Sequence, residues 1–149
     1  MKDLAKNFLS DSDRQKIDAA VKAAEGQTSG EVVPMVISAA YHYPMADVIG
    51  AAVFTIPLAV VLTRLLGQWL WIGGQNLWLF LGVGALLFIL FHTLVARIPA
   101  LKRCFISHRE MEEEVQEAAV TRFFGQGLHR TRDETGVLIL ISVFERKVW

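Results

Sequence analysis

Two apolar runs decide how this chain folds: VIGAAVFTIPLAVVLTRLL at residues 48–66 and LWLFLGVGALLFILFHTLVA at residues 77–96. Arg64 is the only charged residue in these runs or in the connector, residues 67–76, that joins them. Each run approaches the roughly 20 apolar residues that a helix needs to cross a bilayer. Because backbone polar groups cannot be left open in hydrocarbon, two such runs with a short connector predict a transmembrane helical hairpin.

The rest of the chain has the composition of a soluble domain. The sequence has 149 residues and a formal net charge of zero, and nearly all of its charged side chains lie outside the hairpin. A neutral balance gives no support for nucleic-acid binding, which needs a basic surface. The single Cys104 excludes an internal disulfide and fits a reducing compartment. A soluble helical protein with both runs as core helices is an alternative that the near absence of charge over residues 48–96 disfavours.

Residues 1–45 have the pattern of the first part of an α/β domain. Ser10 precedes apolar residues at helical spacing, which predicts a helix over residues 11–25. A β-branched and almost continuously apolar run then predicts a strand over residues 31–38. The predicted hairpin with its flanks, residues 46–98, follows this strand and interrupts the domain.

Residues 99–149 continue the same domain. Ser107 and Glu110 have the spacing of a capping box and begin a predicted helix over residues 108–124. The run at residues 136–143 is apolar on both faces and predicts a central strand, after which a further strand begins. We therefore expect an α/β fold, a small sheet with packed helices, in a chain that is C-terminally incomplete because the central strand needs further cover.

Basic and small residues indicate how the hairpin is oriented and how its two helices pack. Lysine and arginine cluster just beyond the second run, at Arg97, Lys102, Arg103 and Arg109, whereas the connector carries no charge. The positive-inside rule therefore predicts that both termini are cytoplasmic and that the connector lies outside. Small residues predict a close contact between the two helices, and they are Gly50, Ala51, Ala52, Gly82, Gly84 and Ala85.

The order of these motifs resembles a known family. Thr28-Ser29-Gly30-Glu31 opens the first strand, two membrane spans follow, and Gly136–Val148 contains the last strand and Glu145-Arg146-Lys147. This pattern is similar to the TPM domain of thylakoid acid-phosphatase-like and photosystem II repair proteins. Within this family, the chain looks more like the bacterial membrane-bound branch, in which a transmembrane hairpin is inserted in the domain. The resemblance implies an α/β sandwich that the hairpin anchors in the bacterial inner (plasma) membrane.

The resemblance also implies two functions, which stay open at this point. The first is a binding, assembly or quality-control module for other membrane proteins, anchored in the lipid bilayer. The second is a metal-dependent, calcium-linked acid-phosphatase-like hydrolase. Where the soluble branch has Asp-Asn before its central strand, this chain has Glu134-Thr135, with Asp133 one place earlier.

Three carboxylates are candidate metal ligands: Glu31, Asp133 and Glu134. Glu31 opens the first strand, and the other two lie in the loop that enters the central strand. Together with backbone and water oxygens, they could hold a hard cation such as calcium. The alternative is that all three are surface charges or caps. The sequence contains no Cys-x5-Arg and no Gly-rich phosphate loop, and no catalytic residue is predicted.

Overall fold

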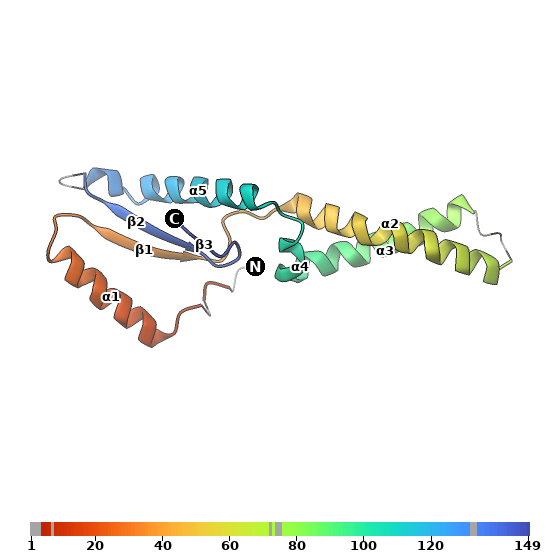
Figure 1. Cartoon of the computed structure of the whole chain (residues 1–149), viewed down its shortest axis with the longest axis horizontal. Helices are drawn as coiled ribbons and strands as arrows, with labels where there is room; N and C mark the ends of the chain where they lie inside the picture. Colours follow the sequence, from red (N-terminus) through yellow and green to blue (C-terminus); the bar gives the residue numbers. More distant parts are fainter. Residues whose placement is uncertain (1–3, 7, 72, 74–75, 132–133) are drawn as a thin grey trace. The chain divides into compact units, whose positions relative to one another are not determined.

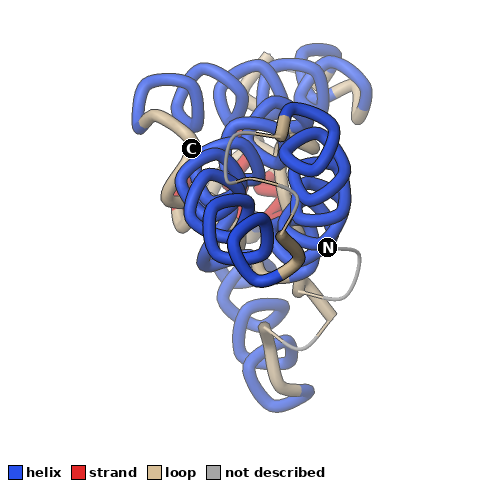
Figure 2. The backbone as a smooth tube through the Cα atoms, turned by 90° about the vertical axis from the view of Figure 1, so that its right-hand side faces the viewer, coloured by secondary structure: helices blue, strands red, loops and turns tan. Residues whose placement is uncertain are grey.

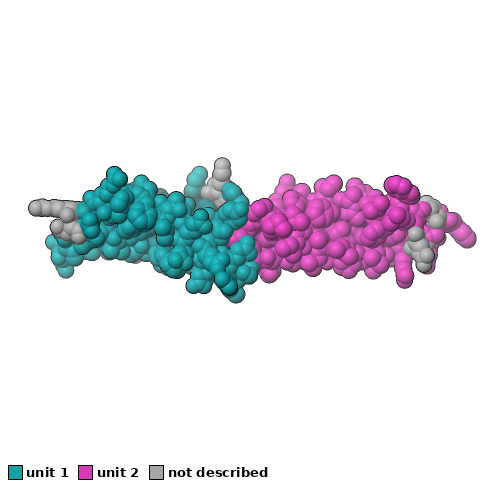
Figure 3. All heavy atoms as spheres, turned by 90° about the horizontal axis from the view of Figure 1, so that it is seen from above, with its two compact units in different colours: residues 1–42, 107–149 teal, residues 43–106 magenta. Residues whose placement is uncertain are grey.

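The chain forms two compact units in the computed structural model, which describes residues 4–6, 8–71, 73, 76–131 and 134–149 (Figure 1). One unit comprises residues 1–42 and 107–149, and the other comprises residues 43–106 (Figure 3). The first unit combines a three-stranded sheet with two α-helices, whereas the second is helical. The mixed α/β class predicted from the sequence is confirmed.

The sheet combines the chain segments that precede and follow the helical hairpin. Its strands are β1 (Val32–Ile37), β2 (Val137–Ser142) and β3 (Lys147–Val148), in the order β1-β2-β3. β1 and β2 are parallel, although the whole helical hairpin lies between them in the sequence. β3 pairs with β2 in the antiparallel direction. β2 is therefore the central strand, as its continuous apolar run predicted.

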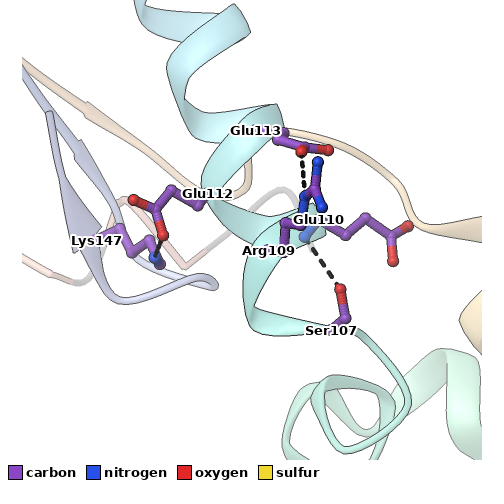
Figure 4. A network of polar contacts seen from close by, with 6 residues as sticks. All are labelled: Ser107, Arg109, Glu110, Glu112, Glu113 and Lys147. Atoms are coloured by element: carbon purple, nitrogen blue, oxygen red, sulfur yellow. Dashed lines mark hydrogen bonds and ion pairs between the residues drawn. The ribbon is translucent and has the colours of Figure 1, made fainter.

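Both long helices of this unit begin at a capping serine. α1 (Asp11–Glu25) starts after Ser10, whose hydroxyl accepts a hydrogen bond from the Asp13 N–H at 3.2 Å. α5 (His108–Gly125) starts after Ser107, whose hydroxyl accepts from the Glu110 N–H at 3.1 Å (Figure 4). These bonds satisfy N–H groups that a first helical turn leaves open. The predicted bounds of both helices agree with the structure to within one residue.

The core of this unit lies between α5 and one face of the sheet. Ala118 and Ala119 of α5 pack with Leu140 of β2, and Met35 and Ile37 of β1 pack against them. Small alanines let the helix backbone come close to the larger strand side chains. α1 buries none of its residues, and Val137 and Ile139 of β2 are exposed.

The second unit is a helical hairpin. It contains α2 (Pro44–Trp69), α3 (Leu77–Arg97) and the short α4 (Pro99–Arg103). Figure 2 shows the two long helices side by side. Both are long and apolar enough to cross a membrane by length and composition. The predicted runs 48–66 and 77–96 lie within them.

Small residues form the contact face of α2 at steps of about four. The buried positions of this helix are Ala46, Gly50, Ala51, Thr55, Ala59, Thr63 and Gly67. On α3 the prediction holds at the half-buried Gly84, where an added Cβ would lie 4.0 Å from Ala59 Cβ, but it is wrong at Gly82 and Ala85, which are exposed. A larger residue of α3 also meets the small residues of α2, because a Cβ on Gly50 would lie 3.1 Å from Val95, which is buried.

A glycine at the entrance of β2 gives a test of the packing. A Cβ on Gly136 would lie 2.2 Å from the carbonyl oxygen of Leu128, so the backbone would have to move. We expect Gly136→Ala to lower the free energy of unfolding by about 2 kcal/mol, since overpacking typically costs this much. Denaturant titration of the detergent-solubilised chain measures the change.

The matched control is Gly125→Ala. No atom of the described residues lies within 4 Å of the Cβ that this substitution adds, and the position ends α5. We expect its stability to change by less than about 1 kcal/mol, the scale of helix propensity. Equal losses for the two variants would contradict this account of Gly136.

Candidate functional site

The structure brings two of the three predicted metal ligands to one end of the sheet. The carbonyl oxygen of Glu31 accepts a hydrogen bond from the Val137 N–H at 2.8 Å. A Cβ on the preceding Gly30 would lie 2.6 Å from the carbonyl oxygen of Thr135. Glu31 and Glu134 therefore stand just before the amino ends of adjacent parallel strands, with exposed side chains. Asp133, the third predicted ligand, lies outside the described residues.

Glu134 occupies a tight turn. Its φ is 54°, in the left-handed region that few non-glycine residues adopt, and its N–H donates to the Thr131 carbonyl at 3.0 Å. Among the residues that the structure describes, no three or more His, Cys, Asp or Glu side chains gather closely enough to hold a metal ion. Ligands of open α/β sheets usually gather at the carboxyl ends of the strands, which is the other end from Glu31 and Glu134.

The carboxyl ends of the strands hold a buried carboxylate that the sequence analysis missed. Glu145 is 2% exposed. One carboxylate oxygen accepts from the Ala40 N–H at 2.9 Å, and the other accepts from the hydroxyl of Ser142. Ala40 follows β1 and Ser142 ends β2, so Glu145 ties together the ends of both strands. The Ser-x-x-Glu spacing of Ser142 and Glu145 was the available signal.

Glutamates of α5 surround this end of the sheet with negative charge. Partial burial raises the pKa of Glu114, and the neighbouring carboxylates of Glu117, Glu110, Glu113 and Glu145 raise it further. With Arg122 and Ala40, Glu114 and Glu117 are among the residues that line a hollow of about 230 Å³. The pKa shift means that the protonated form of Glu114 is favoured more than in a free side chain.

Two ion pairs compensate other charges of the same helix (Figure 4). Glu112 pairs with Lys147 at 2.9 Å, and Glu113 pairs with Arg109 at 2.7 Å. The hydrogen bond and the charge of Glu113 raise the pKa of Arg109. Both pairs are on the exposed side of α5, and such pairs contribute little to stability.

An open apolar groove lies on another part of the α/β unit. It has a volume of about 460 Å³ and lies between the second half of α5 and the start of β2. None of the described residues of its lining has a charged side chain, and they are Ala119, Val120, Phe123, Phe124, Gly136, Val137, Leu138 and Trp149. The groove suits an apolar ligand or peptide better than it suits hydrolysis, because catalysis needs polar groups.

The hairpin unit holds an ion pair that the sequence analysis also missed. Lys102 Nζ lies 2.8 Å from Asp47 Oδ2, and the two side chains are only 4% and 14% exposed. The positive-inside prediction included Lys102 among the cations that orient the hairpin, but Asp47 neutralises the charge of Lys102. The pair joins α4 to the first turn of α2. It therefore fixes the end of the hairpin that lies away from the connector.

Removing one partner of this pair should leave a buried charge without compensation. We expect Lys102→Met to destabilise the hairpin by about 3 kcal/mol, the usual cost of breaking a buried pair. The double variant Asp47→Leu/Lys102→Met should recover most of that loss, since no charge is then buried. SDS titration in mixed micelles, followed by circular dichroism, measures both effects.

Arg103→Met serves as the control, because it removes an adjacent cation of α4 that is less buried than Lys102. We expect it to change stability by less than about 0.5 kcal/mol, as surface substitutions usually do. A double variant that is as unstable as Lys102→Met would contradict the role of the pair.

Comparisons of the chain with protein-family models, with curated proteins and with solved structures find no match. The resemblance to the TPM domain therefore stands on the sequence motifs alone.

Proposed function

We propose that α2 and α3 anchor this chain in a bacterial plasma membrane, and that its α/β unit is a binding and assembly module for other membrane proteins. The observation that carries the anchoring is the exposure of apolar side chains along the hairpin. Leu86 is 72% exposed, and Ile56 and Ile89 are exposed similarly. Core helices of a soluble protein bury such side chains, whereas α3 buries only Val95. A bilayer supplies the missing apolar surroundings.

The pairing of the strands supports the topology. β1 precedes the hairpin and β2 follows it, yet the two strands lie in one sheet. Two membrane-crossing helices return the chain to the side from which it started, so such a sheet requires an even number of crossings. Arg97 and Arg103 flank the hairpin at that end, and positive flanks favour the cytoplasm. Both termini are therefore cytoplasmic in this proposal.

The binding role rests on the apolar groove of the α/β unit. Its open volume is formed by aromatic and aliphatic side chains, and groups for acid–base chemistry are absent from its described lining. Exposed apolar patches on a soluble face mark interaction sites. Anchoring by two helices holds such a groove near the membrane, where other membrane proteins present their segments.

A calcium-linked hydrolase is the second candidate. The observation that favours it is the placement of Glu31 and Glu134 before two adjacent parallel strands. Calcium takes six to eight oxygens, so backbone carbonyls and water would have to complete the site.

Cysteine labelling tests the topology. The chain has one cysteine, Cys104, whose side chain is exposed in the hairpin unit. We expect a membrane-impermeant maleimide to label Cys104 only after the cells are permeabilised, because α4 lies on the cytoplasmic side in this proposal. In a Cys104→Ser background, Gln75→Cys in the connector should react in intact cells. Labelling of Cys104 in intact cells would reverse the orientation.

Purification from native membranes tests the function. We expect the chain, extracted in a mild detergent, to carry one membrane protein at a fixed ratio. The double variant Glu31→Gln/Glu134→Gln should keep that protein, since the groove does not include these side chains. A chain that purifies alone and hydrolyses a phosphomonoester in calcium, with the double variant inactive, would contradict the binding role and establish the second candidate.

A further inference from the structure

We propose that Arg97 and Arg103 bind the headgroup phosphate of an anionic phospholipid, and that the exposed leucines of α3 contact one of its acyl chains. This inference names a ligand for the membrane anchor, and it rests on the membrane-spanning part of the proposed function.

The hairpin unit has two positive charges without a counter-charge at the end that lies away from the connector. Asp47 is the only acidic residue in the sequence from 43 to 106, and Lys102 pairs with it at 2.8 Å. Neither Arg97 nor Arg103 forms an ion pair or a side-chain hydrogen bond with any residue that the structure describes. An anion from outside the chain can therefore bind both arginines without displacing an existing partner.

The two arginines lie on either side of one short turn. Arg97 is exposed in the last turn of α3, and Arg103 is half-buried in the last turn of α4. Ile98 between the two helices is extended, with φ −103° and ψ 99°. Two extended steps and the rise of α4 keep the Cα atoms of the two arginines no more than about 13 Å apart. Two long side chains can converge on one headgroup across such a distance.

An apolar stripe of α3 leads to this pair of cations. Leu86, Leu90 and Leu94 are exposed and follow one another at steps of four residues. Arg97 comes three residues after Leu94, so it continues the same face of the helix. A row of exposed leucines that ends in a cation matches a phospholipid, whose acyl chain ends in a phosphate group.

The charge of the site selects among phospholipids. The planar guanidinium of arginine donates several N–H groups and fits the oxygens of a phosphate. Phosphatidylcholine adds a quaternary ammonium that two arginines repel, whereas phosphatidylglycerol has a net negative charge. Cations next to a membrane span attract anionic lipids in this way. We therefore expect the site to prefer phosphatidylglycerol.

The single cysteine provides a reporter, because Cys104 is exposed and adjacent to Arg103. The full chain, with bimane on Cys104, is placed in liposomes that contain the same small fraction of nitroxide-labelled phosphatidylglycerol or phosphatidylcholine. Both lipids carry the nitroxide near the headgroup end of one acyl chain. We expect phosphatidylglycerol to quench bimane at least about threefold more efficiently, and this preference to weaken at high salt.

Two variants separate the two arginines from other cations. Arg97→Gln/Arg103→Gln should make the two lipids quench equally, with an unchanged far-ultraviolet circular dichroism spectrum. Arg64→Gln removes an exposed arginine of α2 near the connector and should keep the preference. The charge-preserving variant Arg97→Lys/Arg103→Lys should keep most of it. A preference that survives Arg97→Gln/Arg103→Gln would overturn the site.

A soluble competitor identifies the source of the phosphate. Glycerol phosphate at millimolar concentration should leave the preference unchanged, because it lacks the acyl chain that contacts the leucines. Loss of the preference in glycerol phosphate would overturn a lipid site.

The failure of this site is distinguishable from the failure of the membrane anchor. Strong and equal quenching by the two lipids in the native chain would overturn the lipid site and leave the anchor standing, because the reporter then lies at a bilayer surface. Absence of quenching by either lipid would contradict both.

Discussion

The parallel pairing of β1 with β2 is the constraint on which the rest of the structure depends. Parallel strands need a long crossover, and in most α/β proteins one helix supplies it. Here the crossover contains the whole hairpin, α4 and α5. Six residues of each strand are in register, from Val32 opposite Val137 to Ile37 opposite Ser142. The two chain segments that flank the hairpin are therefore parts of one fold, and neither completes the sheet alone.

Two sets of polar interactions hold the ends of this long crossover. In the α/β unit, Glu145 binds the backbone just after β1 and the hydroxyl that ends β2. In the hairpin unit, Asp47 and Lys102 join the first turn of α2 to α4. Both involve ionisable side chains that are largely buried, and such side chains need hydrogen-bond or ion-pair partners. Their position suggests a role in register and specificity.

Local patterns account for the parts of the fold that the sequence predicts well. Helical spacing and the capping residues Ser10 and Ser107 give the bounds of α1 and α5, and continuous apolar runs give β1, β2 and the two long helices. These signals depend on neighbours a few residues apart, so they survive without knowledge of the tertiary structure.

Long-range contacts account for the parts that sequence reasoning missed. Asp47 and Lys102 are 55 residues apart, and Glu145 and Ala40 are 105 apart, so no local pattern joins them. The groove likewise combines α5 with β2 and Trp149. For α3, the small residues Gly82 and Ala85 suggested a contact face, but they are exposed, whereas Val95 is buried. Of the predicted metal ligands, Glu31 and Glu134 share one end of the sheet.

The central claim is that exposed apolar side chains of the hairpin face lipid, and spin-label accessibility measures this most directly. Labels at Leu86→Cys, Val95→Cys and Gln27→Cys, each in a Cys104→Ser background in liposomes, sample an exposed hairpin site, a buried one and a turn. Oxygen concentrates in lipid, whereas a polar nickel complex stays in water. The account predicts that the Leu86 label collides with oxygen and is shielded from nickel, that the Val95 label meets neither, and that the Gln27 label meets nickel. A Leu86 label that is accessible to nickel, or shielded from both reagents, would contradict a lipid-embedded hairpin.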